Sequence, residues 1–491
     1  MTPRLCVTVT AATTAELRRR RDAVGDADLV ELRLDSVADP DVAGALAGRR
    51  RPVIVTCRPS WEGGSFKGDE TTRRGLLAQA LELGAEYVDI EWKAGFTDLL
   101  QITSGKRIVL SSHEFSGVPR DLAERAAAMR ATGVEVIKIA VAANRLSDCL
   151  PLKALAEDRR ASAGTQVLIA MGEAGVATRV LAGRFGSAWS YAGALPGLGQ
   201  VSPEELLATY RFREVTPATE VYGVVGSPVS HSVSPAMHNA AFRAAKRDAV
   251  YLPLAAADAE DFLGFAKEMG VAGASVTIPF KRALFERVPI ASSMAQRIGA
   301  LNTLRSADGR WAGDNTDAAG FLQPLQTRGV GLAGLRASIL GAGGSARAVA
   351  VGLAGGGASV AVHARDRSRA EAVAAEVAGT AGPWPPVPGT WDLLVNCTPI
   401  GMHPHVDGSP MPAHALVGAT VYDLVYNPEE TRLLKEAKKA GCRTIGGLEM
   451  LVAQAQAQFR WWTGMDPDPE VMRSAAARKL AEFKAHENHV V

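Results

Sequence analysis

Eight short apolar segments, regularly spaced over the first 213 residues, restrict the fold more than any other feature of this sequence. They begin near residues 5, 29, 52, 87, 107, 134, 165 and 187, as in "LCVTVT", "YVDIE" and "VEVIKIAV". Most are separated by stretches long enough for a helix, and near-continuous apolar strands are typical of a parallel sheet buried on both faces. The segments therefore predict a compact (β/α)8 TIM barrel, and their spacing leaves an open doubly wound sheet as the alternative.

The remaining sequence predicts a two-lobed α/β region after the barrel. Residues 1–213 form the predicted barrel, and the charged, proline-containing segment 214–220 is the predicted linker. A second α/β domain is expected over residues 221–330 and a third, of Rossmann type, over residues 331–446. Residues 447–491 have a long helical pattern and are expected to return to the second domain.

Composition excludes several classes of protein. The net charge of +2 gives no electrostatic basis for binding nucleic acid or a membrane surface. Five scattered cysteines without a C-x-x-C pair predict reduced thiols, with neither a disulfide framework nor a metal site. No apolar run reaches transmembrane length, and the first apolar segment starts too early for a signal peptide, so we expect a cytoplasmic protein.

Polar residues interrupt the apolar segments near their C-terminal ends, where a barrel has its active site. These residues are Glu31, Arg33, Arg58, His113 and Lys138. Lys138 lies in the middle of "EVIKIAV", where an unpaired ammonium group would be costly to bury. Two interpretations stay open: an ion pair with Glu31 that serves the structure, or an amine that loses its proton easily and forms an imine with a substrate.

The motifs "ELRLD", "CRPSWEGGSF", "SSHEF", "VIKIA" and "GVATRVLAGRFGS" follow the order and spacing of type I 3-dehydroquinate dehydratases, which the first 213 residues resemble. The resemblance implies that Lys138 forms an imine with the substrate ketone and that His113 transfers protons. It also implies that Glu62 orients His113 and that Arg179 binds the substrate carboxylate. The residues implied to hold the ring hydroxyls are Glu31, Arg33, Arg58 and Gln200.

One segment departs from that family. The family pattern Ser-Ala-Pro-Gly-Gln is replaced here by Pro196-Gly197-Leu198-Gly199-Gln200. Gln200 is retained but the serine is missing, so we expect a different cover over the substrate.

A dinucleotide site is predicted at "SILGAGGSARA", a glycine-rich loop between a strand and a helix. Gly341, Gly343 and Ala346 form a G-x-G-x-x-A pattern, which places a pyrophosphate at a helix N-terminus, and Ala342 and Gly344 lie in the same loop. At the end of the next strand, Arg365 and Arg369 suit a 2′-phosphate, whereas Asp366 suits a bare ribose. Two cations against one anion favour NADP over NAD.

The segment "SVTIPFK" places Lys281 directly after a strand and a proline. A solvated surface lysine and a catalytic lysine are both compatible with that position. The surrounding motifs "GSPVSHSVSPAMHN", "GALNTL", "GDNTDAAGF", "NCTPIGM", "DLVYNP" and "GGLEMLVAQA" resemble shikimate dehydrogenases from residue 220 to about 470. That resemblance implies that Lys281 and Asp317 transfer the proton while a hydride moves at the same carbon.

The same resemblance implies further site residues. Thr398 is implied to contact the cofactor, and the implied substrate residues are Ser232, Ser234, Thr277, Asn302, Tyr426 and Gln454. Structural roles are also compatible with two of them, because Ser234 can be the N-cap of a helix with Pro235 at its first position, and Asn302 can occupy a turn. Two patterns depart from the family: Ser-Lys-Ser becomes Ser232-Val233-Ser234, and Asn-Arg-Thr becomes Ala364-Arg365-Asp366.

Together the two resemblances imply a bifunctional enzyme of aromatic biosynthesis, in the shikimate pathway. It would dehydrate 3-dehydroquinate to 3-dehydroshikimate and reduce that product to shikimate with NADPH. The alternatives are a dehydratase fused to an NAD-linked quinate/shikimate dehydrogenase, and a non-catalytic regulator that senses metabolites. A monomer and a homodimer are equally compatible with the sequence.

Overall fold

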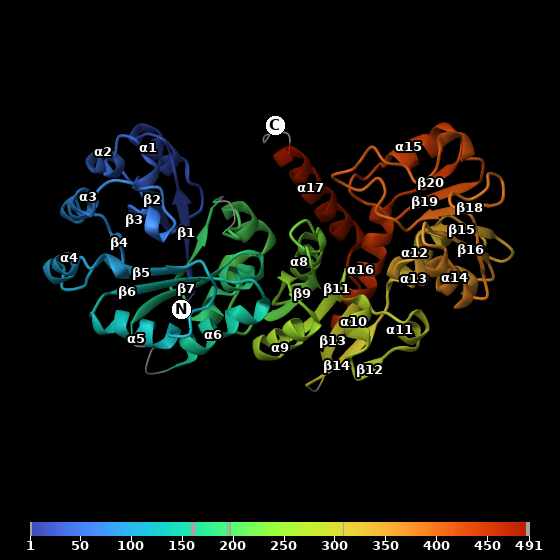
Figure 1. Cartoon of the computed structure of the whole chain (residues 1–491), viewed down its shortest axis with the longest axis horizontal. Coiled ribbons are helices and arrows are strands. Elements are labelled where there is room, and N and C mark those ends of the chain that lie inside the picture. Colours follow the sequence, from blue (N-terminus) through green and yellow to red (C-terminus); the bar gives the residue numbers. More distant parts are fainter. Residues whose placement is uncertain (1, 159–163, 194, 196–197, 308, 488–491) are drawn as a thin grey trace. The chain divides into compact units, whose positions relative to one another are not determined.

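The computed structural model describes residues 2–158, 164–193, 195, 198–307 and 309–487. The chain forms two compact units (Figure 1). One contains Met1–Glu220 and Leu252–Gly270, and the other contains Val221–Tyr251 and Val271–Val491. Residues 252–270 thus belong to the first unit, although the sequence assigns them to the second domain; the sequence-based domain limits remain a prediction.

The first unit contains eight strands, one for each apolar segment of the sequence. Hydrogen-bonded neighbours are parallel, in the order β7-β6-β5-β4-β3-β2-β1-β8. The strands are β1 (Arg4–Val9), β2 (Leu29–Arg33), β3 (Val53–Thr56), β4 (Tyr87–Glu91), β5 (Ile108–Glu114), β6 (Val136–Ala142), β7 (Thr165–Met171) and β8 (Trp189–Ala192).

The sheet comes close to closing on itself, because its two end strands β7 and β8 meet. The Ala188 N–H donates to the Gln166 carbonyl at 2.8 Å. The Leu168 N–H donates to Ser187 Oγ at 2.9 Å. The near-closed parallel barrel confirms the TIM-barrel prediction and rules out the open doubly wound sheet.

Helices connect the barrel strands, and two of them show why they start where they do. Thr13 accepts the N–H of Glu16, and Asp69 accepts the N–H of Thr72, so a side-chain oxygen satisfies a free amide at each N-terminus. The helices are α1 (Thr14–Ala23), α2 (Val42–Leu46), α3 (Glu70–Glu82), α4 (Thr97–Ile102), α5 (Leu122–Ala131), α6 (Leu150–Glu157) and α7 (Val176–Val180), and α9 (Ala259–Met269) lies in the same unit.

A mixed sheet follows in the chain, with the strand order β10-β9-β11-β13-β14-β12. β11 runs parallel to β9 and antiparallel to β13. The strands are β9 (Glu220–Gly226), β10 (Ala249–Ala255), β11 (Val271–Val276), β12 (Ile290–Ala291), β13 (Thr303–Ala307) and β14 (Arg310–Asp314). The helices of this lobe are α8 (Ser234–Ala244), α10 (Lys281–Phe285), α11 (Ser293–Ile298) and α12 (Asp317–Thr327).

The last sheet is parallel throughout, with the order β17-β16-β15-β18-β19-β20. Successive strands leave β15 in opposite directions, the arrangement at which doubly wound sheets bind ligands. The strands are β15 (Arg336–Leu340), β16 (Ser359–His363), β17 (Thr380–Ala381), β18 (Leu393–Asn396), β19 (Thr420–Asp423) and β20 (Arg443–Ile445). The helices are α13 (Gly344–Gly355), α14 (Arg367–Ala375) and α15 (Arg432–Lys439), followed by α16 (Gly447–Thr463) and α17 (Pro469–Glu487).

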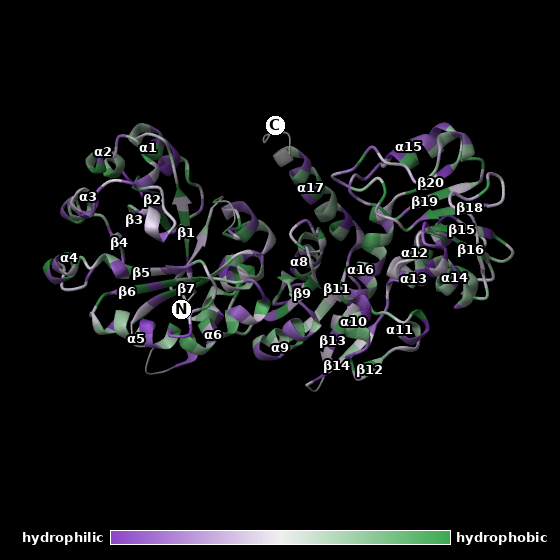
Figure 2. Ribbon diagram, viewed as in Figure 1, coloured by the Kyte–Doolittle hydropathy of each residue, from purple (hydrophilic) through white to green (hydrophobic). Residues whose placement is uncertain are grey.

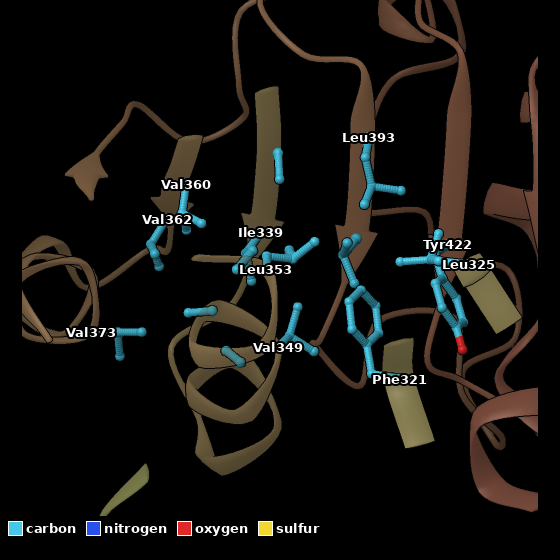
Figure 3. Close-up of a cluster of buried hydrophobic side chains, with 14 of the residues drawn as sticks. Phe321, Leu325, Ile339, Val349, Leu353, Val360, Val362, Val373, Leu393 and Tyr422 are labelled. Carbon is cyan, nitrogen blue, oxygen red and sulfur yellow. The ribbon is translucent and has the colours of Figure 1, made fainter. Parts of the chain in front are cut away.

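The core of this lobe joins its sheet to the helix that precedes it. Figure 3 shows Phe321 and Leu325 of α12 beside strand residues such as Ile339 and Leu393, all of them fully buried. In Figure 2, most of β18 is coloured as hydrophobic, in keeping with a parallel strand buried on both faces. α16 packs against α12, and α17 packs against α8 and α16.

Within the described residues, no helix is both long and apolar enough to cross a membrane.

Candidate functional sites

Residues in the interior of three barrel strands bring one lysine to two carboxylates. Lys138 of β6 is 5% exposed, and its Nζ lies 3.3 Å from Glu31 Oε1 on β2 and 3.1 Å from Asp89 Oδ2 on β4. The ring of Tyr191 on β8 has its centroid 4.2 Å from Nζ. Both carboxylates accept hydrogen bonds from Nζ, so the ion pair with Glu31 is present, and the amine lies at the same place that imine formation would require.

Charges of opposite sign alternate around this lysine. Arg58 donates to Asp89 Oδ1 at 2.8 Å and to Glu91 Oε1 at 2.6 Å. Burial would raise the pKa of Asp89, but the charges of Arg58 and Lys138 hold it well below its usual value. For Glu31 too, burial opposes ionisation, but the charges of Lys138, Arg33 and Arg58 together lower the pKa. Both carboxylates beside Lys138 are therefore anions at neutral pH.

His113 lies on β5 with its imidazole fixed by Glu62. Nδ1 is 2.9 Å from Glu62 Oε1, which also accepts the His113 backbone N–H at 2.9 Å. Burial lowers the pKa of His113 well below its usual value, and the charges of Arg58 and Lys138 add to the effect. A neutral ring that donates through Nδ1 leaves the lone pair of Nε2 free to accept a proton.

Two other predicted substrate residues differ in how they are held. Arg33 makes a bidentate contact with Asp35 at 2.8 and 2.9 Å. Arg179 is 3% exposed and donates through Nη2 to the Leu198 carbonyl at 2.7 Å, while its Nε has no hydrogen-bond partner among the described residues. Burial without a nearby anion lowers the pKa of Arg179 to about 10, so an incoming carboxylate would satisfy this side chain.

Gln200 is tied to the loop that precedes it, because its Oε1 accepts the Leu195 N–H at 2.8 Å. Pro196 and Gly197, which carry the departure from the family pattern, lie outside the described residues. The expected change in the cover over the substrate therefore remains a prediction.

Two acids of "YVDIE", Asp89 and Glu91, also belong to this site, although neither is predicted from the sequence. Both are completely buried; Asp89 contacts Lys138 and Arg58, and Glu91 contacts Arg58. The signal that drew attention to Lys138, a charge inside an apolar strand, was equally present in this segment.

In the second unit, Lys281 begins α10, directly after the loop that follows β11. Its Nζ lies 2.5 Å from Asp317 Oδ2, and its side chain is 17% exposed, so it is not a solvated surface lysine. Asp317 begins α12 and accepts the Asn302 amide at Oδ1 at 2.7 Å. The same Asn302 nitrogen lies 3.3 Å from Gln454 Oε1 on α16. Four of the predicted site residues are thus in direct contact.

The remaining predicted substrate residues lie on three other segments of the second unit. The Ser234 N–H donates to Ser232 Oγ at 3.2 Å. The N-cap of α8 is Val233, so Ser234 is the first helical residue and not the N-cap that the sequence suggested as an alternative. Thr277 follows β11 directly and lies in the loop before Lys281, and Tyr426 follows β19. Burial raises the pKa of Tyr426.

The glycine loop between β15 and α13 meets the requirements of a dinucleotide. Gly341 has a φ of +107°, and a Cβ built there would lie 3.1 Å from Thr398 Cγ2 and 3.2 Å from the Cys397 carbonyl oxygen. A Cβ on Gly343 would meet nothing within 4 Å, so its backbone is open to an approaching group. Helix α13 begins at Gly344, two residues after Ala342 and two before the buried Ala346. The free amides at this helix N-terminus would bind a phosphate.

The catalytic candidates and the glycine loop lie side by side. A Cβ built on Gly344 would lie 3.7 Å from Lys281 Cδ. A dinucleotide on this loop would therefore extend beside Lys281 and Asp317.

Among the charged residues after β16, Asp366 is held by its own helix. Asp366 is the N-cap of α14 and accepts the Arg369 N–H at 3.2 Å and the Ser368 hydroxyl at 2.8 Å. Its Oδ2 is also 3.3 Å from Arg369 Nε. The hydrogen bond from Ser368 lowers the pKa of this carboxyl. Asp366 is thus occupied by its own helix, while Arg365 precedes it in the loop.

Comparisons with known families cover both units. A model described as type I 3-dehydroquinase matches residues 5–217. The shikimate dehydrogenase substrate binding domain matches residues 224–304, and the shikimate 5'-dehydrogenase C-terminal domain matches residues 447–477.

Relatives of known kind resemble either the whole chain or its second half. The bifunctional 3-dehydroquinate dehydratase/shikimate dehydrogenase of Arabidopsis thaliana, a chloroplastic protein, is 35% identical over 482 residues, covering 91% of this chain and 79% of that protein. The NADP(+) shikimate dehydrogenase of Symbiobacterium thermophilum is 41% identical and covers 53% of this chain and 94% of its own. The shikimate dehydrogenase of Thermus thermophilus, solved with NADP(H) and shikimate, has a TM-score of 0.50 at 40% identity and covers 53% of this chain and 99% of that one.

Proposed function

We propose, since the chain belongs to the family of bifunctional 3-dehydroquinate dehydratase/shikimate dehydrogenases, that it catalyses both of these reactions. The barrel would dehydrate 3-dehydroquinate to 3-dehydroshikimate, and the second unit would reduce this product to shikimate. The observation that carries the proposal is the presence of two complete sets of reactive groups in one chain. Lys138 lies with His113 and Glu62 in the first unit, and Lys281 pairs with Asp317 beside a glycine loop in the second.

For the barrel, imine chemistry follows from the position of Lys138. Its nitrogen would attack the ketone carbon, and the carbonyl oxygen would leave as water, which leaves an electron-withdrawing imine. The neutral His113 would take a proton from the neighbouring carbon through Nε2 and return it to the departing hydroxyl, which leaves as water. A water molecule would then hydrolyse the imine, which restores the ketone of the product and frees Lys138. The remaining groups would bind the substrate: Glu31, Arg33, Arg58, Arg179 and Gln200.

For the second unit, the Lys281–Asp317 pair would exchange a proton with the oxygen of the carbon that is reduced. NADPH, when bound, supplies the hydride. Gly341, Ala342, Gly343, Gly344, Ala346 and Thr398 would hold its pyrophosphate side, and Arg365 and Arg369 its 2′-phosphate. The substrate would be held by Ser232, Ser234, Thr277, Asn302, Tyr426 and Gln454.

The cofactor choice is supported by the contacts of Asp366. The Asp366 carboxylate caps α14 and pairs with Arg369. It is therefore not an unpaired negative charge that would repel a 2′-phosphate. The relatives from Symbiobacterium thermophilum and Thermus thermophilus are likewise associated with NADP. An NAD-linked quinate dehydrogenase and a non-catalytic sensor have no comparable support.

The test is a two-step assay of the purified full-length chain. 3-Dehydroquinate is added with NADPH or with NADH, and 3-dehydroshikimate and cofactor oxidation are followed separately. We expect the intermediate to form without cofactor and NADPH to be oxidised only once it has formed. Dehydration without reduction would refute the assignment of the second unit, and faster oxidation of NADH would favour the quinate reaction.

Finer features of the proposal are the domain limits, the location and the assembly. We retain a barrel over residues 1–213, a linker over 214–220, lobes over 221–330 and 331–446 and terminal helices over 447–491. We also retain a cytoplasmic enzyme that acts on small molecules, either as a monomer or as a homodimer. Limited proteolysis, fractionation of the source cells and sedimentation would test these three points.

A further inference from the structure

Tyr251 is a completely buried tyrosine of β10 that the site described above does not include. Its ring stacks on His238 at a centroid distance of 4.5 Å, and Trp462 lies 6.1 Å away. Its backbone N–H and carbonyl are both bonded to the Asn239 amide at 2.8 Å. Both the backbone and the ring are therefore fixed, and the position of the hydroxyl is determined with them.

A chain of hydrogen bonds starts at this hydroxyl. Tyr251 donates to Ser275 Oγ at 2.6 Å, and Ser275 donates to Gln458 Oε1 at 2.6 Å. Gln458 then donates through Nε2 to the Asn302 carbonyl at 3.0 Å. Asn302 in turn donates through Nδ2 to Asp317 Oδ1 at 2.7 Å.

Every donor in this chain points toward Asp317. The tyrosine has a single hydrogen, and because Ser275 receives it, the Ser275 hydrogen is directed to the Gln458 oxygen. The Gln458 amide must then present its nitrogen to the Asn302 carbonyl. All five residues are at most 8% exposed, so water cannot replace a bond that is lost.

We propose that Tyr251 is a positioning residue for the reductase reaction, acting through the direction that its hydroxyl imposes on Ser275 and Gln458. The inference rests on the proposed function of the second unit. Without the tyrosine hydroxyl, Ser275 can accept instead of donate, and the Gln458 amide can turn its oxygen toward the Asn302 carbonyl. Repulsion between these oxygens would displace Asn302 and, with it, the carboxylate that pairs with Lys281.

The test uses Tyr251→Phe, which removes one oxygen and keeps the ring. We expect kcat for reduction of 3-dehydroshikimate to fall roughly tenfold, because misplacement of an acid–base group acts on the chemical step. The KM for NADPH should stay within about twofold, because the glycine loop is untouched. Deuterated NADPH should give a larger isotope effect than in the wild type, because a slower chemical step becomes rate-limiting.

The chain offers two controls. Tyr422→Phe removes another fully buried hydroxyl of the same unit, one without a hydrogen-bond partner among the described residues, and should leave kcat unchanged. Dehydration by the barrel serves as an internal control in every variant. Ser275→Ala breaks the next bond, so it should reproduce the effect of Tyr251→Phe, and the double variant should be no slower than either alone.

Several results would overturn the inference. One is a Tyr251→Phe enzyme with the same kcat as Tyr422→Phe. Another is a Tyr251→Phe enzyme with a lower melting temperature but an unchanged kcat and isotope effect. Losses that multiply in the double variant would show that the two residues act independently. A wild-type chain that dehydrates but does not reduce would overturn the proposed function itself, and this inference with it.

Discussion

Replacing Glu62 by glutamine should change how the barrel reaction depends on pH. Burial raises the pKa of Glu62 to about 7, whereas it lowers the pKa of His113 well below its usual value. Near neutral pH the residue that changes charge is therefore Glu62. Its carboxylate accepts Nδ1–H of His113 at 2.9 Å and stabilises the imidazolium that forms when Nε2 takes a proton.

The size of the effect follows from the shift of this carboxyl. Raising its pKa from 4.5 to about 7 corresponds to about 3 kcal/mol in favour of the neutral form. The folded chain then binds this proton more tightly than the unfolded chain, so stability is lost as the pH rises from about 4.5 to about 7. Glutamine keeps the acceptor oxygen but cannot ionise, so Glu62→Gln avoids that loss.

Two measurements check this reasoning. The wild-type rate of dehydration should fall about tenfold for each pH unit below about 7. The rate of Glu62→Gln should not change with pH in that range and should be roughly 100-fold below the highest wild-type rate. The difference in unfolding free energy between wild type and variant should change by about 3 kcal/mol in favour of the variant between pH 4 and pH 8.

Glu114→Gln is the matched control, because Glu114 follows His113 on the same strand and bonds to Ser116 instead. It should retain the wild-type profile. If the dehydration rate of Glu62→Gln still fell below about pH 7, another group would cause that fall. The assignment of the pH dependence to Glu62 would then be wrong.

The other predictions concern single groups of the two sites. Borohydride added with 3-dehydroquinate should trap an adduct on Lys138, and Lys138→Ala should abolish dehydration but not reduction; mass spectrometry that maps the adduct elsewhere would contradict the imine. Lys281→Ala and Asp317→Asn should each slow reduction roughly 100-fold while NADPH still binds, as fluorescence titration would show; a loss of cofactor affinity alone would remove them from the chemistry. Arg365→Ala should weaken NADPH far more than NADH, and Asp366→Thr should leave NADPH binding unchanged or stronger; a wild type that prefers NADH would refute the NADP assignment.

Much of the fold could be predicted from the sequence because it depends on local patterns. The barrel strands match the apolar segments, since a parallel strand buried on both faces needs a continuous apolar run. The glycine loop could also be recognised from the sequence. Its backbone needs glycine, as the φ of +107° at Gly341 shows, so the conformation leaves a visible residue pattern. The order of the motifs then indicated the bifunctional dehydratase/dehydrogenase family, and the similarity to the Arabidopsis relative confirms this prediction.

The partners of the charged residues were decided by the tertiary structure. Lys138 and Asp89 are 49 positions apart, and they meet only because β4 and β6 are brought to the same face of the barrel. The sequence offered Glu31 as a partner for Lys138 but passed over Asp89, because a buried acid gives no sign of which cation it will contact. The same holds for Asp366. In the sequence its carboxylate was compatible with either cofactor, and only the structure shows that it caps a helix and pairs with Arg369.

Side chains without an obvious chemical motif depended most on the three-dimensional structure. The sequence placed Tyr251 in an apolar strand, where a tyrosine needs no explanation beyond packing. Its role in our inference comes from a hydroxyl 2.6 Å from Ser275, and from Gln458, which lies 183 residues beyond that serine. Local patterns in the amino-acid sequence specify which segments are buried and which motifs they carry. Only the folded chain set the distances and the directions of the hydrogen bonds, because these arise between residues that no local pattern links.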